Sequence, residues 1–181
     1  MYNKYIDGRN VKERCETSTK HSERVPVLKI SNLPEGIICD LDGTISLFTP
    51  EMRNPYDASR CEFDILNRPL AEIIMALYKL GKKLIFVSGR EDKYKEQTEK
   101  FLHKHLDELK DDGSITPMQY DLYMRQTGDS RKDFLIKKEI YMQLIKDKYN
   151  IICVFDDRVS VCKMWRHELG LMVFQLNDIE F

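Results

Sequence analysis

Three short apolar runs constrain what this chain can fold into more than any other feature. They cover Gly36–Cys39, Lys83–Val87 and Ile151–Phe155, and stretches with helical spacing of apolar residues lie between them. Short buried strands that alternate with helices are typical of a parallel sheet with helices on both faces. The sequence therefore predicts an α/β fold built on such a sheet.

The remaining elements follow the same alternation. Asn67 can cap a helix that carries apolar residues at helical spacing and ends at Gly81. Further helices are expected over 92–106, 132–146 and 161–169, further strands over Val27–Ile30, Met118–Met124 and Leu171–Leu176, and a turn over Asp111–Gly113. Residues 1–35 are polar and charged, so we expect an N-terminal arm or peripheral segment, followed by one domain over residues 36–181.

The composition excludes several classes of protein. The chain has 181 residues, of which 42% are hydrophobic, with 29 Lys and Arg against 30 Asp and Glu and a net charge of -1. This balance excludes a disordered chain of low hydrophobicity and argues against a globally basic nucleic-acid binder, although the total does not describe local patches. No apolar stretch approaches the roughly 18–20 residues of a membrane span, and the first residues lack the apolar core of a secretion signal. We therefore expect no membrane partner.

The five cysteines favour a reducing compartment. Their number is odd and no Cys-x-x-Cys motif occurs, so their spacing predicts neither a disulfide framework nor a zinc site. The cytoplasm is the expected location. The four histidines share no metal-ligand spacing and are expected to be solvated or structural.

Polar residues with a common chemistry follow each of the three apolar runs. They are Asp40-Leu41-Asp42-Gly43-Thr44, Ser88-Gly89-Arg90 and Asp156-Asp157. In a parallel α/β sheet, ligands bind beyond the carboxyl ends of the strands, so these segments are expected to meet in one site.

Such a site has the chemistry of phosphate and metal binding. Carboxylates in one crevice repel one another unless a cation or a shared proton intervenes, and hard oxygen ligands suit Mg²⁺. A phosphoryl group would also need donors, for which the candidates are Thr44, Ser88, Gly89, Arg90 and Lys132. Taken alone, Asp-Gly after a strand could be only a turn. An EF-hand loop is excluded, because its required glycine would fall at Ile45.

This combination resembles the haloacid-dehalogenase-like phosphohydrolase superfamily. Its motifs match Asp40–Thr44 (DxDGT), Ser88, Lys132 and the acidic pair Asp156-Asp157. The resemblance implies a Rossmann-like sheet with a minimal cap. It also implies that Asp40 is the nucleophile that forms an aspartyl-phosphate, and that Asp42 is the general acid and base. By the same resemblance, Ser88 and Lys132 bind the transferring phosphoryl group, and Mg²⁺ is held by Asp40, the Asp42 carbonyl, Asp156 and Asp157. An acid at position 42 favours a phosphatase over a dehalogenase.

A closer resemblance is to the 3'-phosphatase domain of bacteriophage-type polynucleotide kinase/phosphatase enzymes, and it extends over about Gly36 to Phe181. Besides the first motif, it rests on Arg53–Asp57, Val87–Glu91, Gly128–Asp133, Phe155–Arg158 and Met164–Arg166. It implies that Arg53 and Arg90 contact phosphate or nucleic-acid backbone and that Asp129 orients a basic partner. Alternatives from the residues alone are a solvated loop position for Arg53 and a simple helix cap for Asp129. The kinase loop GxxxxGK[ST] does not occur, so 5'-kinase activity is not expected.

The sequence thus predicts an Mg²⁺-dependent phosphatase that removes a terminal 3'-phosphate from DNA or RNA in end healing, with a separate kinase or ligase as a candidate partner. Little room exists for a cap domain, so the site should be open to a large substrate. Two alternatives stay open: a phosphatase of nucleotides or other small phosphomonoesters, and a non-catalytic module that binds nucleic-acid ends. The choice between DNA and RNA depends on 2'-hydroxyl contacts that the sequence does not reveal.

Overall fold

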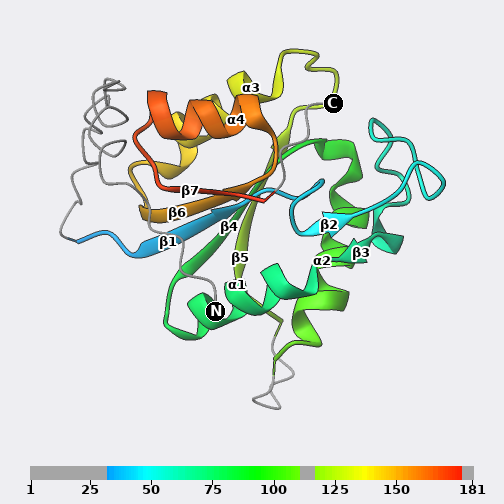
Figure 1. Ribbon diagram of the computed structural model, residues 1–181, viewed down its shortest axis with the longest axis horizontal. Helices are drawn as coiled ribbons and strands as arrows, with labels where there is room; N and C mark the ends of the chain where they lie inside the picture. Colours follow the sequence, from blue (N-terminus) through cyan, green and yellow to red (C-terminus); the bar gives the residue numbers. More distant parts are fainter. Residues whose placement is uncertain (1–31, 111–116, 177–181) are drawn as a thin grey trace, which may run out of the picture.

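The computed structural model describes residues 32–110 and 117–176, and a five-stranded parallel sheet forms its centre (Figure 1). The strands are β1 (Glu35–Cys39), β4 (Lys83–Glu91), β5 (Tyr120–Arg125), β6 (Asn150–Asp156) and β7 (Val173–Gln175). Their order is β5-β4-β1-β6-β7, and every neighbouring pair is parallel. The carboxyl ends of the central strands β4, β1 and β6 therefore lie side by side.

Helices cover both faces of the sheet. In Figure 1, α1 (Arg68–Lys79) and α2 (Lys95–Asp107) lie below it, and α3 (Asp133–Ile140) and α4 (Val159–Lys163) lie above it. A 3-10 turn over Asp92–Tyr94 precedes α2, whereas α3 and α4 continue as π-helical turns over Tyr141–Ile145 and Met164–Glu168. This arrangement confirms the predicted α/β fold with helices on both faces.

Each face of the sheet has its own hydrophobic core, because successive strand residues point to opposite faces. Ile37 and Phe86 pack with residues of α1 and α2 in one cluster, whereas the adjacent Ile38 and Val87 pack with residues of α3 and α4 in the other. All four side chains are at most 1% exposed. Burial on both sides explains why these strands appear in the sequence as continuous apolar runs instead of an alternating pattern.

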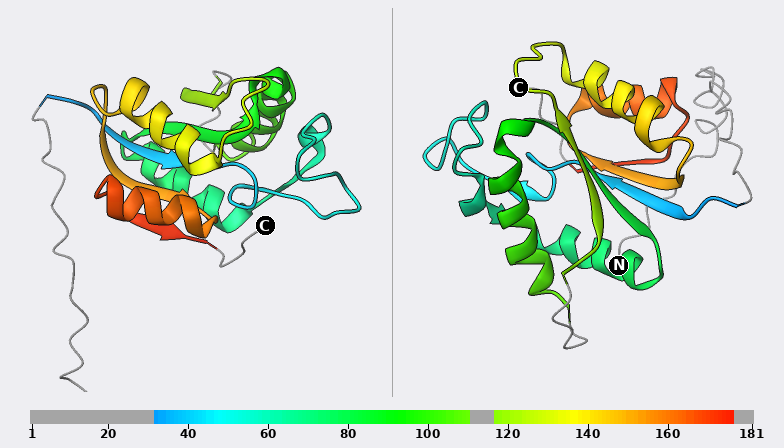
Figure 2. Two further views of the ribbon diagram at one scale, coloured as in Figure 1. Left: turned by 90° about the horizontal axis from the view of Figure 1, so that it is seen from above. Right: turned by 180° about the vertical axis from the view of Figure 1, so that it is seen from behind.

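A small substructure takes the place of a cap. The two-residue strands β2 (Ser46–Leu47) and β3 (Ile65–Leu66) pair antiparallel, and the loop between them contains a 3-10 turn over Cys61–Phe63. This loop projects away from the sheet in Figure 2. The minimal cap expected from the sequence is thereby confirmed, since β2, β3 and their loop lie between β1 and α1 in the chain.

Most predicted elements occur within a few residues of their expected bounds, with one informative difference. β4 continues to Glu91, so Ser88-Gly89-Arg90 lies inside the strand and not after it. Its pairing with β5 is interrupted between Ser88 and Glu91, an irregularity that lets the strand continue while its central residues leave the regular ladder. Residues 1–31 of the expected arm over residues 1–35 lie outside the described residues, as do the strand over Val27–Ile30 and the turn over Asp111–Gly113. The predicted arm was one residue too long, because Glu35 already belongs to β1. Within the described part of the chain, none of the helices has the length and hydrophobicity that a membrane crossing requires.

Candidate active site

Three buried carboxylates meet at the carboxyl ends of β1 and β6. Asp40, Asp156 and Asp157 are 5%, 1% and 5% exposed, and one oxygen from each lies within 4.8 Å of the others. The Asp40 backbone amide continues the sheet by donating to the Phe155 carbonyl at 2.9 Å, which fixes the first carboxylate beside the other two.

The turn that follows Asp40 fits tightly against this cluster. Gly43 has a φ of +77°, and a Cβ at this position would come within 2.2 Å of Asp157 Oδ2. Both the backbone conformation and the lack of space therefore require glycine here. The next residue, Thr44, is fully buried and its hydroxyl donates to Asp157 Oδ1 at 3.2 Å. Thr44 thus orients an acidic side chain.

A buried lysine from α3 supplies the positive charge of the cluster. Lys137 Nζ lies 2.8 Å from Asp40 Oδ1, 3.0 Å from Asp156 Oδ2 and 3.5 Å from Asp133 Oδ2. Its side chain is only 1% exposed. Burial alone would lower the pKa of Lys137, but the surrounding carboxylates raise it well above its usual value, so the ammonium stays charged.

The cluster carries more negative than positive charge. Burial raises the pKa of Asp40 well above its usual range; Lys137 opposes this effect, and Asp156, Asp157 and Asp133 add to it. Burial and the charge of Asp156 likewise raise the pKa of Asp157. Asp133 is also paired with Arg125, whose Nη2 lies 3.3 Å from Asp133 Oδ1. The Lys137 ammonium thus faces the three remaining carboxylates, and a divalent cation would compensate the net negative charge.

The donor set fits such a cation. Asp40, Asp156 and Asp157 offer hard carboxylate oxygens that converge at one place, which is the ligand type that Mg²⁺ takes from proteins. These three residues would hold the ion. The Asp42 carboxylate is not one of the three converging acids, and the predicted contribution of its main-chain carbonyl stays a prediction.

Asp42 instead faces two buried arginines. Arg90 donates to it from Nε at 2.9 Å and from Nη2 at 2.7 Å, and Arg53 donates to the same carboxylate through Nη2. Both guanidinium groups also bind Asp64, with Arg53 donating from Nε at 2.8 Å. Ser46 completes the network by donating to Asp64 at 2.6 Å and accepting from Arg90 at 2.7 Å.

This network determines the protonation state of Asp42. Burial alone would raise the pKa of Asp42, but the Arg90 and Arg53 guanidinium groups lower it below its usual value. Two arginines and two aspartates balance in charge, so the network needs no further ion. Asp42 is therefore held as a carboxylate beside the cluster.

The end of β4 contributes a hydroxyl and a backbone segment. Ser88 is fully buried, and its hydroxyl accepts a hydrogen bond from the Arg90 amide at 3.1 Å. A Cβ on Gly89 would come within 2.3 Å of Asp133 Oδ1, so the glycine lets β4 and the start of α3 approach closely. The bulged strand thus lies directly against the helix that carries Lys137.

Several predicted site residues take other positions in the structure. Lys132 is exposed and caps α3 with extended backbone, so it does not join the cluster, and Lys137 does. Because Lys137 is one helical turn beyond Asp133, both side chains point the same way. Asp129 is partly buried and pairs with a basic residue, Arg131, which lowers its pKa to about 2. Arg53 and Arg90, expected on phosphate, are 3% and 1% exposed at their side chains and are engaged with Asp42 and Asp64.

Sequence reasoning missed three residues of the site, namely Asp64, Asp133 and Lys137. The Asp133–Lys137 spacing of four on a predicted helix was the available signal, since it places the two side chains on one face. No comparable signal marked Asp64, which enters the site only because β3 pairs with β2.

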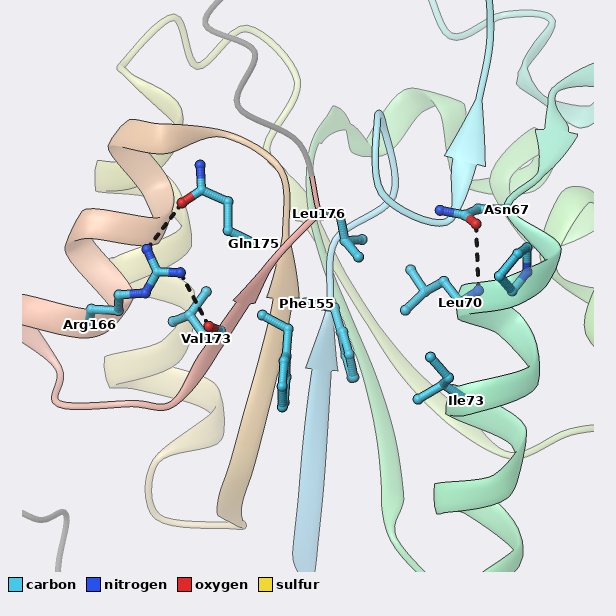
Figure 3. Close-up of a pocket in the computed structure, with 10 residues that line it drawn as sticks. Asn67, Leu70, Ile73, Phe155, Arg166, Val173, Gln175 and Leu176 are labelled. Carbon is cyan, nitrogen blue, oxygen red and sulfur yellow. Dashed lines mark hydrogen bonds between the residues drawn. The ribbon is translucent and has the colours of Figure 1, made fainter. Parts of the chain in front are cut away.

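A separate pocket of about 470 Å³ lies between β7 and α1 (Figure 3). Its lining is mostly apolar and includes Leu70, Ile73, Phe155 and Leu176, while Arg166 at its edge donates to Gln175 and to the Val173 carbonyl. No predicted site residue lines this pocket.

Comparison with known proteins shows the family to which this chain belongs. Residues 34–181 match the family model described as the polynucleotide kinase PNKP phosphatase domain. A putative bifunctional polynucleotide kinase/RNA ligase of Autographa californica nuclear polyhedrosis virus is 34% identical over 135 residues, which are 74% of this chain and 18% of that protein.

Solved structures give the same result. A chain of the Pnkp1/Rnl/Hen1 RNA repair complex is 41% identical, with a TM-score of 0.78 over 90% of this chain and 48% of that one. A class C acid phosphatase from Bacillus anthracis, solved with tungstate bound, has a TM-score of 0.58 at 13% identity and shares the fold. This chain spans half or less of these first two relatives. The predicted resemblance is confirmed: the chain belongs to the family of polynucleotide kinase PNKP phosphatase domains, within the haloacid-dehalogenase-like phosphatases.

Proposed function

We propose that this phosphatase domain removes the terminal 3'-phosphate from polynucleotides with the help of Mg²⁺. The observation that carries the proposal is the pairing of two carboxylates with different surroundings. Asp40 lies with Lys137 and two further acids, whereas Asp42 is held by two arginines. Two carboxylates in different environments suit a nucleophile and a proton-transfer group.

In the first step Asp40 attacks phosphorus. A bond forms between a carboxylate oxygen and phosphorus, the bond from phosphorus to the 3'-oxygen breaks, and the leaving oxygen takes a proton from Asp42. Because the arginines keep Asp42 ionised in the free protein, the proton reaches it from the monoanionic form of the phosphate, whose second pKa is about 6.

In the second step a water molecule attacks the phosphorus of the aspartyl-phosphate and Asp42 takes its proton, which releases phosphate and restores Asp40. We propose that Lys137, 2.8 Å from Asp40, and the buried Ser88 hydroxyl donate to the transferring group. When bound by Asp40, Asp156 and Asp157, Mg²⁺ supplies Lewis-acid stabilisation of the phosphoryl oxygens.

The polynucleotide substrate is supported by two observations. The relatives are named for polynucleotide kinase, RNA ligase and RNA repair, and the described chain between β1 and α1 holds only β2, β3 and their loop, which is too small for an enclosing cap domain. We therefore propose RNA ends as the first substrate to examine, with DNA ends beside them, and a kinase and a ligase as partners in the same repair process.

The test compares phosphate release from RNA and DNA oligonucleotides that carry a 3'-phosphate or a 5'-phosphate, and from mononucleotides, with Mg²⁺ or EDTA. The proposal expects release from 3'-phosphate ends that stops in EDTA and in Asp40→Asn. Equal rates on both ends, or on mononucleotides, would favour a general phosphomonoesterase. End binding without turnover of any phosphomonoester would favour a non-catalytic module.

A further inference from the structure

Trp165 is the only tryptophan of the chain, and its indole reaches the acidic cluster from inside the core. It lies in the π-helical turn over Met164–Glu168, is fully buried and packs edge-on against Tyr141, with ring centroids 5.9 Å apart. Its Nε1 donates to Asp156 Oδ2 at 3.2 Å. A buried indole N–H needs an acceptor, and here that acceptor is a carboxylate of the site.

The two oxygens of Asp156 have different partners. Oδ2 accepts from both Trp165 Nε1 and Lys137 Nζ, the latter at 3.0 Å. Oδ1 accepts from the Arg158 backbone amide at 3.2 Å, its single hydrogen bond among the residues described. Two donors on Oδ2 therefore leave Oδ1 as the oxygen with more free lone-pair capacity for a cation.

Trp165 and Lys137 constrain Asp156 in different ways. Lys137 divides its ammonium among Asp40, Asp133 and Asp156 on a flexible stem, so it is a shared charge. The indole is held by packing on all sides and has a single donor in a fixed direction. Trp165, on Oδ2, and the Arg158 backbone amide, on Oδ1, are thus the fixed donors that set the direction of the Asp156 carboxylate, and Trp165 is the one supplied by a side chain.

We propose that Trp165 is a positioning residue, which holds Oδ2 of Asp156 so that this carboxylate binds a divalent cation together with Asp40 and Asp157. The inference rests on the cation-dependent phosphatase proposed above. Outer partners of metal ligands typically change metal affinity by about 10–100-fold when they are removed. Removal of the indole N–H of Trp165 should therefore weaken the binding of the divalent cation, even when a substitution keeps most of the volume of the ring.

The test measures Mn²⁺ binding to the full chain by electron paramagnetic resonance after EDTA treatment. Trp165→Phe keeps an aromatic ring and removes the donor, and we expect its Mn²⁺ affinity to fall by about 10–100-fold. At saturating Mg²⁺ its kcat should return close to that of the wild type, a recovery that a general loss of structure would not give. Phe101→Leu, a truncation in the opposite core, is the matched control and should bind Mn²⁺ like the wild type.

The outcomes separate the two proposals. Equal Mn²⁺ affinity of the wild type and Trp165→Phe would overturn the positioning role and leave the phosphatase proposal intact. A wild-type protein that binds no Mn²⁺ would overturn both. If Trp165→Phe does not fold, the wild-type protein provides the test through the fluorescence of its single tryptophan. The emission should change on addition of Mg²⁺, with the same midpoint concentration as the activation of the enzyme by Mg²⁺. Unchanged emission would overturn the inference.

Discussion

Lys137 Nζ lies 2.8 Å from Asp40 Oδ1, so a buried lysine of α3 neutralises the carboxylate that we propose as the nucleophile. The two residues come from segments far apart in the chain, and the parallel sheet brings them together. The same lysine reaches Asp156 at 3.0 Å. Asp133 lies 3.5 Å from the same ammonium, so a single charge serves three acids of the site.

Replacement of Lys137 should abolish most of the activity. Lys137→Met removes a charged donor to the transferring group, and loss of one such donor typically lowers kcat by about 10²–10³-fold. Steady-state phosphate release from a 3'-phosphate oligonucleotide is the measurement. Lys132→Met is the matched control, because the exposed Lys132 should keep near-wild-type activity. The reverse ranking would restore the prediction from the sequence that Lys132 is the catalytic lysine.

Asp42→Asn should separate the two steps of the reaction. An aryl phosphate such as p-nitrophenyl phosphate has a leaving group that needs no proton, so attack by Asp40 can proceed without the acid. Activation of water in the second step still needs Asp42. Rapid-mixing kinetics should show a burst of about one equivalent of nitrophenol and then slow turnover. A linear time course at the wild-type rate would remove Asp42 from its role as the base that activates water.

The rate on a 3'-phosphate end should fall as the pH rises. The arginines lower the pKa of Asp42 and keep it ionised, so the proton for the leaving oxygen comes from the phosphate monoanion, which loses it above a pKa of about 6. We expect kcat/KM to decrease between pH 6 and 8, measured at constant ionic strength. The leaving group of nitrophenyl phosphate needs no acid, so kcat/KM on that substrate should depend less on the protonation of Asp42 and therefore less on pH. An increase of kcat/KM between pH 6 and 8 on the oligonucleotide would contradict the assignment of Asp42 as the general acid.

Gly43→Ala should affect both stability and function, whereas Gly81→Ala should affect stability alone. Both glycines have positive φ angles, +77° and +81°, so a side chain costs about 1–2 kcal/mol of backbone strain at either position. Only at Gly43 would the added Cβ also meet Asp157. Thermal unfolding and Mn²⁺ binding, measured side by side, distinguish the two effects. Wild-type cation affinity in Gly43→Ala would show that Asp157 can move without consequence.

The stability of the fold should decrease when the pH falls below about 6.5 through His105. Burial and the charge of Lys104 lower the pKa of His105, whose ring packs on Phe101 with centroids 4.8 Å apart. In this pH range the unfolded chain takes up a proton that the folded chain does not, so acid favours unfolding. His105→Gln should reduce the difference in denaturation midpoint between pH 7 and pH 5. The exposed His167→Gln should retain it, and equal profiles for all three proteins would exclude this role for His105.

Much of the fold was predictable because burial on both faces of the sheet produces a simple pattern. Gly36–Cys39 and Ile151–Phe155 form strands with no competing periodicity, and the acids after them lie where the sheet ends. The helix after Gly128 was also predicted, but Lys132 precedes its first turn, whereas Lys137 lies among its buried residues with Ile136 and Ile140. The buried face of the helix therefore decides which lysine points inward.

The network around Asp42 could not be predicted in the same way. Arg53 and Asp64 lie in the loop between β2 and β3 and at its end, and their positions depend on a two-residue pairing without a strong sequence pattern. From sequence, an arginine beside a phosphate site is expected to contact phosphate. In the structure, the guanidinium groups of Arg53 and Arg90 bind the carboxylates of Asp64 and Asp42. These contacts depend on tertiary packing and could not be predicted from the sequence.

The closed network of Asp42, Arg53, Asp64 and Arg90 has a consequence for how such domains diverge. Loss of any one member leaves an unpaired charge in the interior, which typically costs about 3–5 kcal/mol, whereas joint replacement by apolar residues can be neutral. Natural selection should therefore remove single substitutions at these positions even in domains whose catalytic activity is no longer under selection. A related domain that has lost the catalytic activity should therefore lack all four charged residues together. The joint absence of these residues from a related sequence would indicate that its ancestor had lost the reaction.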